Sequence, residues 1–458
     1  MKYTNGLFIF RRDLRLIDNI GLNSASKQCE KLYTTFYFTP EQVLNNKYKS
    51  ENAVQFMIES LFELEKDIKE LNGELIVLLG EHLKILDMLC STLSIEAIFF
   101  NKDYSPYSMK RDEIIVNYCK SKNIKCFLFQ DYYLYEPEQI LTSTNKPFQK
   151  YTPFYNIAIK EEVMKPNRIQ IKNLTKNRKK LKFNYSLDNA YSKLIKKNDK
   201  ILVNGGRING KQRLRDTLKE QEMYDDKRDN LNYNTSFLSA YIKFGCISIR
   251  EVYNEVKKKF GIKHGIIREL IWREFFANIL YHYPEVLKGS YHYKDIKWKG
   301  DIKNFKKWCE GKTGFPVVDA GMRQLNETGY MHNRCRMITA TFLVKTLLLD
   351  WRLGEKYFAQ RLTDYDPASN NGNWQGISST GVDMKPYFRT MNPWIQSKKF
   401  DKNCEYIKKW IPELKDVSAK DIHNWYSCYN KYNTYVAPIA DYKETKEKMM
   451  QMYKEATF

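Results

Sequence analysis

The sequence predicts two domains of different class. An α/β domain with a parallel sheet of the Rossmann or flavodoxin type is expected over 1–130, and an all-α domain over 201–458. Short apolar runs alternate with helix-length segments through the first part, whereas strand-length runs are absent from about residue 205 onward. Segment 131–200 holds four prolines and a basic run, so we expect a linker there.

The expected strands of the α/β domain are short and largely apolar. They lie at 7–10, 32–38, 75–79, 97–100 and 124–129. A long amphipathic helix is expected over 50–71, with Ser50 as its N-cap and Gly73 just past its end. Two further helices are expected at about 82–93 and 106–122. Such alternation predicts parallel strands with helices on both faces of the sheet.

The composition excludes several classes of protein. Of 458 residues, 43% are hydrophobic and 14% aromatic, which excludes a disordered chain. No apolar run approaches the roughly 18 residues of a membrane span. Nine scattered cysteines, without a Cys-x-x-Cys pair, favour a reducing intracellular compartment over a disulfide framework or a zinc site. The net charge of +22 suits a nucleic-acid partner, although an AT-rich coding sequence would also enrich lysine.

Polar residues interrupt a largely apolar helix expected over 266–280. Glu269 and Arg273 are four residues apart, close to the face shared by Trp272 and Phe276. A plain i, i+4 ion pair on a partly exposed helix explains this pattern equally well. Alone, the helix therefore does not indicate a site.

A second helix is expected over 331–350, with Asn333, Arg336 and Met337 on one face. It is followed by an Asp- and Asn-rich segment, 362–374, which we expect to be a loop. Because a buried arginine needs a carboxylate partner, Arg336 is expected to pair with Asp364.

Hydroxyl side chains cluster at 234–239. Thr235, Ser236 and Ser239 are expected to open a helix, where backbone N–H groups and hydroxyls favour a phosphate group. Such residues also commonly cap their own helix, so both interpretations stay open at this point.

Together and in this order, these segments resemble the DNA photolyase/cryptochrome family of flavoproteins. The resemblance is carried by FRRDLRL (10–16), TSFLSAYIKFGCIS (235–248), ELIWREF (269–275), WCEGKTGFPVVDAGMRQLNETGYMHNRCRM (308–337), DWRLGEKYFAQRLTDYDPASNNGNWQ (350–375) and STGVDMKPYFRTMNP (379–393). It implies an α/β antenna domain, a linker, and a helical catalytic domain that binds FAD.

The resemblance assigns roles residue by residue. The residues implied to bind FAD are Tyr224, Thr235, Ser236, Leu238, Ser239, Arg273, Arg336, Asp364, Asp366 and Asn370. Four of these would hold the phosphates: Tyr224, Thr235, Ser236 and Ser239. The Arg336–Asp364 pair would lie beside the isoalloxazine ring, with Asp366 at its N3/O2 edge and Asn370 facing N5. Trp374, Trp351 and Trp308 would be the proximal, middle and distal electron carriers.

The implied reaction is light-driven repair of cyclobutane pyrimidine dimers in UV-damaged DNA, by electron transfer from reduced FAD to a flipped-out lesion. Glu269 would bond the lesion's base edges, Trp272 would stack on it, and Asn333 and Met337 would contact it. The residues implied to hold DNA phosphates are Arg334, Arg389, Lys398 and Lys399. We expect an intracellular monomer that binds DNA and neither metal nor membrane.

Three alternatives remain open. Enzymes that repair (6-4) photoproducts resemble this chain but carry histidines at the positions of Asn333 and Met337, whereas this sequence has His332 one residue earlier. Blue-light receptors of the cryptochrome type often have long C-terminal extensions, whereas this chain ends with the segment 442–458, which favours the enzyme. A DNA-binding flavoprotein without repair activity is suggested by Gly376, where class I enzymes place a second lesion-stacking tryptophan; Ile266 likewise replaces an aromatic residue near the flavin.

The antenna chromophore is also open. Ser108 and Met109 stand where folate-binding members carry Asn and Glu, within the loop 101–111. A folate is therefore not expected, and a deazaflavin or an empty site remains possible.

Overall fold

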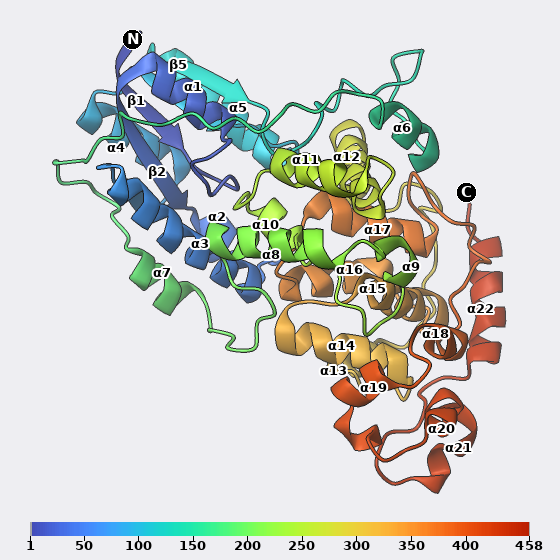
Figure 1. The fold of residues 1–458 in the computed structure, drawn as a ribbon. Helices are drawn as coiled ribbons and strands as arrows, with labels where there is room; N and C mark the ends of the chain where they lie inside the picture. Colours follow the sequence, from blue (N-terminus) through green and yellow to red (C-terminus); the bar gives the residue numbers. More distant parts are fainter. Residues whose placement is uncertain (1, 458) are drawn as a thin grey trace.

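The computed structural model describes residues 2–457 and contains a parallel sheet in its N-terminal part. The strands are β1 (Tyr3–Ile9), β2 (Cys29–Phe38), β3 (Leu75–Leu79), β4 (Ala97–Asn101) and β5 (Lys125–Phe129) (Figure 1). Their order in the sheet is β3-β2-β1-β4-β5, and every pair is parallel. The chain order reverses between β1 and β4, so loops diverge at the carboxyl ends of these two strands.

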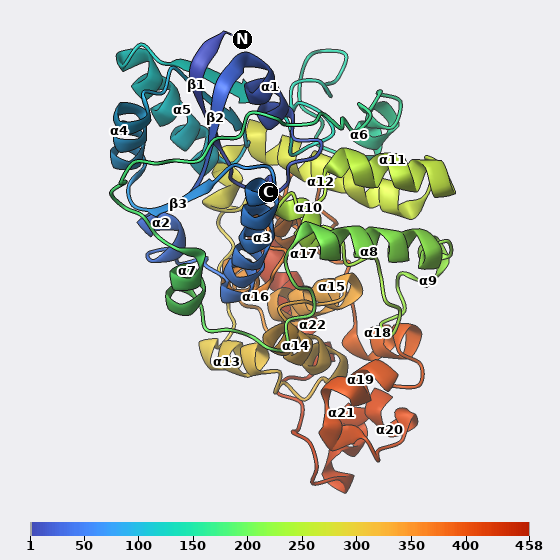
Figure 2. The ribbon, with the colours of Figure 1, turned by 60° about the vertical axis from the view of Figure 1, so that its left-hand side comes forward.

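Helices cover both faces of the sheet, as the alternation predicts. They are α1 (Ile20–Gln28), α2 (Pro40–Val43), α3 (Glu51–Glu70), α4 (His82–Leu93) and α5 (Pro106–Ser121). Leu7 and Ile9 pack with α4 and α5, whereas Phe8 and Phe10 pack with α1 and α3. These two pairs of helices lie on opposite faces of the sheet (Figure 2). Ser50 caps α3 by accepting a hydrogen bond from Ala53 N, which confirms its expected position.

The segment after β5 is more ordered than a plain linker. It contains two short helices, α6 (Tyr151–Ala158) and α7 (Leu187–Leu194). It also returns to the sheet: Leu32 N donates to Asn173 O (2.9 Å), and Leu79 N donates to Phe183 O (3.0 Å). The segment therefore runs along β2 and the edge strand β3, which explains why it needs no strong helix or strand periodicity of its own.

The rest of the chain is helical. Its α-helices are α8 (Arg207–Glu220), α9 (Tyr224–Lys227), α10 (Ser239–Lys243), α11 (Ile249–Phe260), α12 (Gly265–His282), α13 (Ile302–Glu310), α14 (Pro316–Thr328), α15 (Asn333–Thr341), α16 (Trp351–Arg361), α17 (Pro367–Ser378), α18 (Pro393–Phe400), α19 (Glu405–Trp410), α20 (Ala419–His423), α21 (Trp425–Cys428) and α22 (Tyr442–Lys454). Shorter turns are η1 (Pro284–Leu287), η2 (Phe342–Thr346), η3 (Pro412–Leu414) and η4 (Tyr429–Lys431). Within residues 2–457, no helix is long and apolar enough to cross a membrane. The expected fold class is confirmed in both parts.

Two expected boundaries in the helical part are wrong. The helix expected over 331–350 starts only at Asn333, because His332 caps it, and it ends in the π-helical turn η2 before Leu348 adopts a left-handed φ of 55°. The loop expected over 362–374 is mostly the helix α17. Asp366 accepts a hydrogen bond from Ser369 N at its start and proline occupies its first turn, and these signals outweigh the turn preference of the Asn and Gly residues that follow.

A buried ionic network joins the sheet to the helices. Arg15 and Asp18 follow β1, Asp131 follows β5, and Arg250 lies on α11. Arg15 Nη2 is 2.7 Å from Asp131 Oδ2, and Arg250 reaches Asp131 Oδ1 at 2.8 Å and Asp18 Oδ2 at 3.0 Å. Each of these side chains is at most 2% exposed. The network fixes the position of α11 against the carboxyl ends of the sheet.

We predict that Arg250→Met destabilises the folded protein by about 3–5 kcal/mol, because it leaves the buried Asp18 carboxylate without its ion-pair partner. Denaturant unfolding measures this. Lys66→Met is the control, since the Lys66–Glu70 pair is exposed and 4.0 Å apart, and its loss should cost less than about 1 kcal/mol. Equal losses in the two variants would contradict a stabilising role for the network.

Candidate functional site

A deep cavity opens between the helices of the C-terminal part. We call it the central cavity; α9, α12, α15, α17 and the segment before α10 contribute its walls. Its volume is about 510 Å³, within the range of small-molecule sites. A narrower arm of about 100 Å³ adjoins it and shares Asn333, Arg336, Met337 and Asp364 with it.

The Arg336–Asp364 pair expected from the sequence is confirmed. Arg336 Nη2 is 2.9 Å from Asp364 Oδ2, which also accepts a hydrogen bond from Ser239 Oγ (2.7 Å). Arg336 Nε donates to Met331 O (2.8 Å), so the guanidinium is held from two sides. The Asp364 side chain is only 7% exposed, and the pair places one fixed cation in the wall of the central cavity.

Asn370 lies in the narrow arm, where its amide orientation is fixed by Glu355. Its Nδ2 donates to both Glu355 O (3.0 Å) and Glu355 Oε1 (2.8 Å). The amide oxygen is therefore the atom left for a ligand. Burial raises the pKa of Glu355 to about 7, so this carboxyl group changes its protonation near neutral pH.

The hydroxyl-rich segment 234–239 was expected to open a helix, and Thr235 and Ser236 do not do so. Phe237 has a left-handed φ of 50°, and α10 starts only at Ser239 and has five residues. Thr235 and Ser236 therefore precede the helix, because the left-handed residue interrupts helical geometry between them and Ser239. They line the central cavity together with Tyr224, so the polar donors remain gathered at one end of it.

The i, i+4 ion pair on α12 does not form. Glu269 pairs with Arg228 of the neighbouring segment, while Arg273 contacts Glu274 Oε1 (3.3 Å) and donates to Tyr132 O (2.8 Å). Glu269 lines the central cavity. Arg273 is not among the residues that line the central cavity or its narrow arm, and its guanidinium lies over the ring of Tyr133, 4.3 Å from the centroid. Its contact with the cofactor stays a prediction.

Trp272 gives the central cavity a rigid aromatic face. Its ring stacks on Tyr151 with centroids 3.5 Å apart and planes 6° from parallel. Gly376 lines the same cavity, and a Cβ there would meet only Asp383 O, at 3.5 Å. The space that a second stacking side chain would occupy is therefore open.

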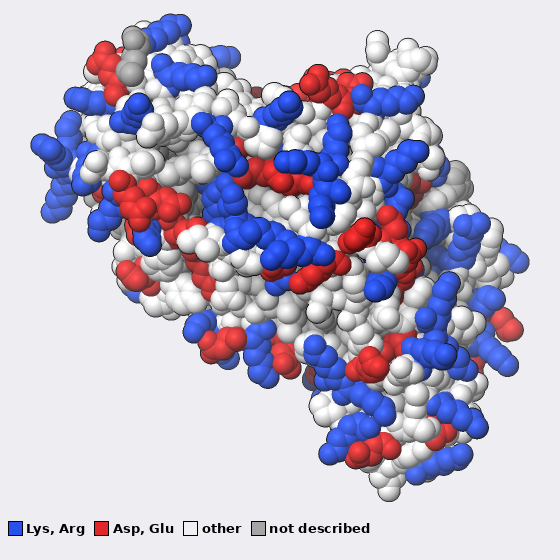
Figure 3. Space-filling model, in the orientation of Figure 1, with Lys and Arg blue, Asp and Glu red and all other residues white. Residues whose placement is uncertain are grey.

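Cations expected to hold phosphates lie at different depths. Arg334 lines the central cavity and pairs with Asp229. Arg389 is exposed, Lys398 Nζ donates to Asn424 Oδ1 (3.0 Å), and Lys399 lies over the ring of Phe400. Figure 3 shows basic side chains over both the α/β and the helical part of one face, interleaved with acidic ones. The net charge is thus not confined to a single patch on that face.

The burial of Trp308 does not suit the distal position expected for it. Trp374 lines the narrow arm, and Trp308 lies 6.3 Å from it between ring centroids. Trp308 is 0% exposed, so it is not at the surface end of a relay, where a distal carrier has to meet its electron donor. Trp298, which the sequence reasoning missed, is partly exposed and packs on the same core as Trp351. Its position among Asp295, Lys297 and Lys299 is the signal for a surface tryptophan.

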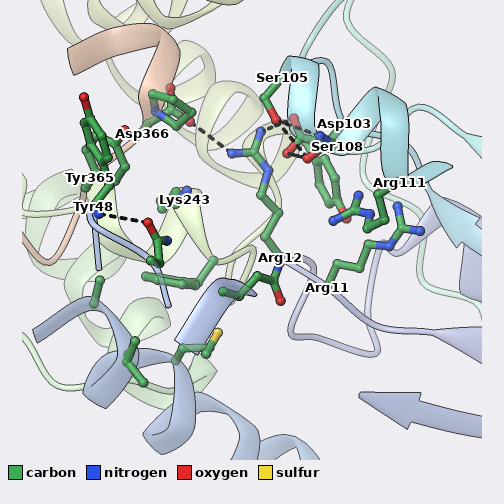
Figure 4. Close-up of a pocket in the computed structure, with 18 of the residues that line it drawn as sticks. Arg11, Arg12, Tyr48, Asp103, Ser105, Ser108, Arg111, Lys243, Tyr365 and Asp366 are labelled. Atoms are coloured by element: carbon green, nitrogen blue, oxygen red, sulfur yellow. Dashed lines mark hydrogen bonds and ion pairs between the residues drawn. The ribbon is translucent and has the colours of Figure 1, made fainter. Parts of the chain in front are cut away.

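A second cavity, of about 280 Å³, lies at the carboxyl ends of β1 and β4, against α10 and α12 (Figure 4). Five buried polar atoms in its lining have no hydrogen-bond partner among the described residues: Arg11 Nη2, Arg12 Nε, Arg111 Nη2, His82 Nε2 and Tyr132 Oη. Because buried donors are normally satisfied, they indicate a polar or anionic ligand. The loop expected near the antenna contributes Ser105 and Ser108, whereas Met109 is exposed. No cluster of His, Cys, Asp or Glu within residues 2–457 could hold a metal ion.

Comparison with known proteins gives concordant matches. A family model described as DNA photolyase matches residues 7–169, and one described as the FAD binding domain of DNA photolyase matches 266–455. The deoxyribodipyrimidine photo-lyase of Buchnera aphidicola subsp. Baizongia pistaciae is 37% identical, over 91% of this chain and 91% of its own length. That of a Synechococcus species is 34% identical, over 91% and 89%.

Solved structures agree with the sequence matches. An archaeal photolyase from Sulfolobus tokodaii, described with two FAD molecules and a novel light-harvesting cofactor, is 39% identical with a TM-score of 0.89, over 98% of this chain and 100% of its own. A class III photolyase from Agrobacterium tumefaciens is 29% identical with a TM-score of 0.91, over 99% and 98%.

Two glycines of α17 should respond oppositely to alanine. Gly376→Ala is predicted to be neutral or to stabilise by up to about 1 kcal/mol, since the Cβ has room and alanine favours the helix. Gly372→Ala should destabilise by about 1–3 kcal/mol, because its Cβ would lie 2.2 Å from Phe276 Cδ1. Thermal unfolding of both variants measures this, and equal stability would contradict the open space at Gly376.

Proposed function

This chain belongs to the DNA photolyase family, and from that we propose a light-dependent lyase that binds FAD and splits cyclobutane pyrimidine dimers in UV-damaged DNA. The observation that carries this proposal is the central cavity, where a fixed Arg336–Asp364 pair and an oriented Asn370 amide adjoin a wall formed by Glu269 and Trp272. One cavity thus joins the residues suited to a flavin and those suited to two linked adjacent bases.

The donor set fits FAD. Thr235 and Ser236 offer hydroxyl groups to phosphates, and Ser239, Tyr224 and Leu238 complete that end of the cavity. The hydroxyl of Ser239 donates to Asp364 Oδ2, so its oxygen and backbone are what Ser239 presents to the cavity. Arg336 supplies a positive charge that suits an electron-rich ring, and Asn370 Oδ1 would accept a hydrogen bond from a ring N–H group. When bound and reduced, FAD supplies on illumination the electron that opens the cyclobutane ring.

The protein's own residues bind and orient the lesion. A dimer reaches the cavity only if it leaves the helical stack, which damaged bases do at lower cost. We propose that Glu269 bonds its base edges, that Trp272 stacks on it, and that Asn333 and Met337 contact it. Arg334 at the cavity and Arg389, Lys398 and Lys399 farther out are proposed phosphate contacts, which fix the register and make binding depend on salt.

The type of lesion that we propose rests on residues at the start of α15. The cavity wall carries an amide and a thioether, from Asn333 and Met337. His332 is 4% exposed and caps α15 by accepting from Arg334 N (3.1 Å). Burial lowers the pKa of His332 to about 4, so the imidazole is neutral and acts in the fold. This supports the cyclobutane dimer over the (6-4) photoproduct.

The second cavity supports a second chromophore. Its five buried polar atoms without a hydrogen-bond partner suit an anionic or polar ligand, and its aromatic lining suits a flat ring. The Sulfolobus tokodaii relative is described with two FAD molecules. We propose a flavin or deazaflavin rather than a folate at this cavity.

An electron route to the cofactor is proposed through Trp374, Trp351 and Trp298. Trp374 lines the cavity, Trp351 is buried with its indole N–H donating to Ser290 Oγ (3.1 Å), and Trp298 reaches the surface. Trp308 lies beside Trp374 but is fully buried, so it offers no contact with an electron donor at the surface.

The route predicts a difference between two single variants. Trp298→Phe should slow the photoreduction of oxidised FAD severalfold in the presence of an external reductant, because it removes the carrier that meets the donor. Trp308→Phe is the matched control and should leave that rate nearly unchanged. Absorption at the flavin bands follows the reaction, and a slowed Trp308→Phe with a normal Trp298→Phe would reverse the assignment.

The function is tested directly by illuminating purified, pre-reduced protein with oligonucleotides that carry one lesion each. We expect restored thymines, measured by chromatography, from the cyclobutane dimer and none from the (6-4) photoproduct or in the dark. Glu269→Ala should retain FAD and lower the repair yield. Restoration of the (6-4) lesion, or of neither lesion, would refute the proposal.

A further inference from the structure

The two cavities share a wall formed by Tyr365 and Asp366. Asp366 lines both the second cavity and the narrow arm of the central cavity. Its Oδ1 accepts from Ser369 N (3.1 Å) and so caps α17, while its Oδ2 accepts from Arg12 Nη1 (3.0 Å). Each carboxylate oxygen keeps further lone pairs that can accept a donor from a ligand.

Arg12 belongs to the other half of the molecule. It follows β1, and its Nη2 contacts Asp103 Oδ1 (3.0 Å) and Tyr133 Oη (2.8 Å). Figure 4 shows its side chain extended between Asp366 on one side and the Asp103–Ser108 turn on the other. The side chains of Arg12 and Asp366 are each 11% exposed, so the pair is little screened by solvent.

Other charged groups around Asp366 do not replace Arg12. Lys243 on α10 and Arg273 on α12 face it, but only Arg12 makes an ion pair with it among residues 2–457. Burial alone would raise the pKa of Asp366; Arg12, followed by Lys243 and Arg273, lowers it below the ordinary range. Tyr133 and Asp103 lie on the far side of the guanidinium.

We propose that Arg12 is a positioning residue for the cofactor: by bridging Asp103 and Asp366, it holds Asp366 as an oriented carboxylate at the wall shared by the two cavities. The inference rests on the proposed binding of FAD in the central cavity. It makes a residue of the α/β part contribute to cofactor binding in the helical part, without direct contact with that cavity.

The test is the dissociation constant of FAD for the full chain, titrated between pH 5 and pH 8. The dissociation constant of each variant is divided by that of the wild type at the same pH. The titration of Glu355, which both proteins share, then cancels from the ratio. For Arg12→Gln the ratio should reach about tenfold at pH 5, equivalent to 1.4 kcal/mol, and shrink toward pH 8. The reason is that, without Arg12, the effect of burial on the pKa of Asp366 is opposed only by Lys243, Arg273 and the Ser369 N–H. The pKa of Asp366 therefore rises, and more of the carboxylate is lost as the pH falls.

Arg207→Gln is the matched control. The Arg207–Glu251 pair is equally buried, at 10% for each side chain, but lines neither cavity. Its ratio should stay flat across the pH range even if the protein is less stable. A rising ratio for Arg207→Gln, or a flat one for Arg12→Gln, would overturn the proposal.

Asp366→Asn keeps the test decisive even if Arg12→Gln fails to fold, because asparagine preserves the cap of α17. Since wild-type Asp366 stays a carboxylate throughout, the ratio for Asp366→Asn should be elevated and independent of pH. If the dissociation constants of Asp366→Asn and wild type became equal near pH 5, Asp366 would be titrating despite Arg12. That result would overturn the inference. Wild-type protein that binds no FAD would instead refute the proposed function.

Discussion

The arrangement of both cavities depends on the buried ionic network at the carboxyl ends of the sheet. Isolated charges are costly to bury, so Asp131 is stable in the interior only while Arg15 and Arg250 both reach it. One arginine follows β1 and the other lies on α11. The requirement to satisfy one carboxylate from two parts of the chain therefore fixes the helices against the sheet, and the second cavity is the space that this docking encloses.

Smaller ionic networks, in which one arginine links acceptors from separate elements, also lie at the two cavities. Arg12 joins Asp103 to Asp366, and Arg336 joins backbone Met331 O to Asp364. In each case a planar guanidinium with several fixed donors bridges groups from separate elements, which a lysine could not do with the same geometry. The carboxylates that face a ligand are thus oriented before it binds, and less ordering is required at the moment of binding.

Much of the fold followed from local sequence signals. Strand positions, the Ser50 cap and the end of α3 shortly before Gly73 depend on neighbouring residues only. The start of α17 was missed because Asp366 and a proline had to be weighed against four turn-forming residues after them. The partner of Glu269 was missed for a different reason: Arg228 is 41 residues away, and periodicity within one helix carries no information about it.

The site shows the same division between local and distant information. Arg336 and Asp364 could be paired because burial of an arginine restricts its partners to carboxylates. Arg12 lies in the FRRDLRL motif, but its two carboxylate acceptors are 91 and 354 residues away along the chain. Trp308 was given the distal role from its motif alone, whereas the exposure of a side chain, which only packing determines, favours Trp298 for that role.

The charged residues near the central cavity favour an anionic ligand. Burial lowers the pKa of Lys385, and so do the neighbouring charges of Arg334 and Arg389, while Asp383 opposes them. Asp383 is itself shared with Lys150 Nζ (3.4 Å) and the backbone of Tyr151 (3.0 Å). These cations therefore repel one another with too few acidic partners nearby, beside the open space at Gly376. A phosphate group of bound DNA would remove that repulsion, so the local excess of positive charge, rather than the total of +22, is the electrostatic feature that favours a nucleic-acid ligand at this cavity.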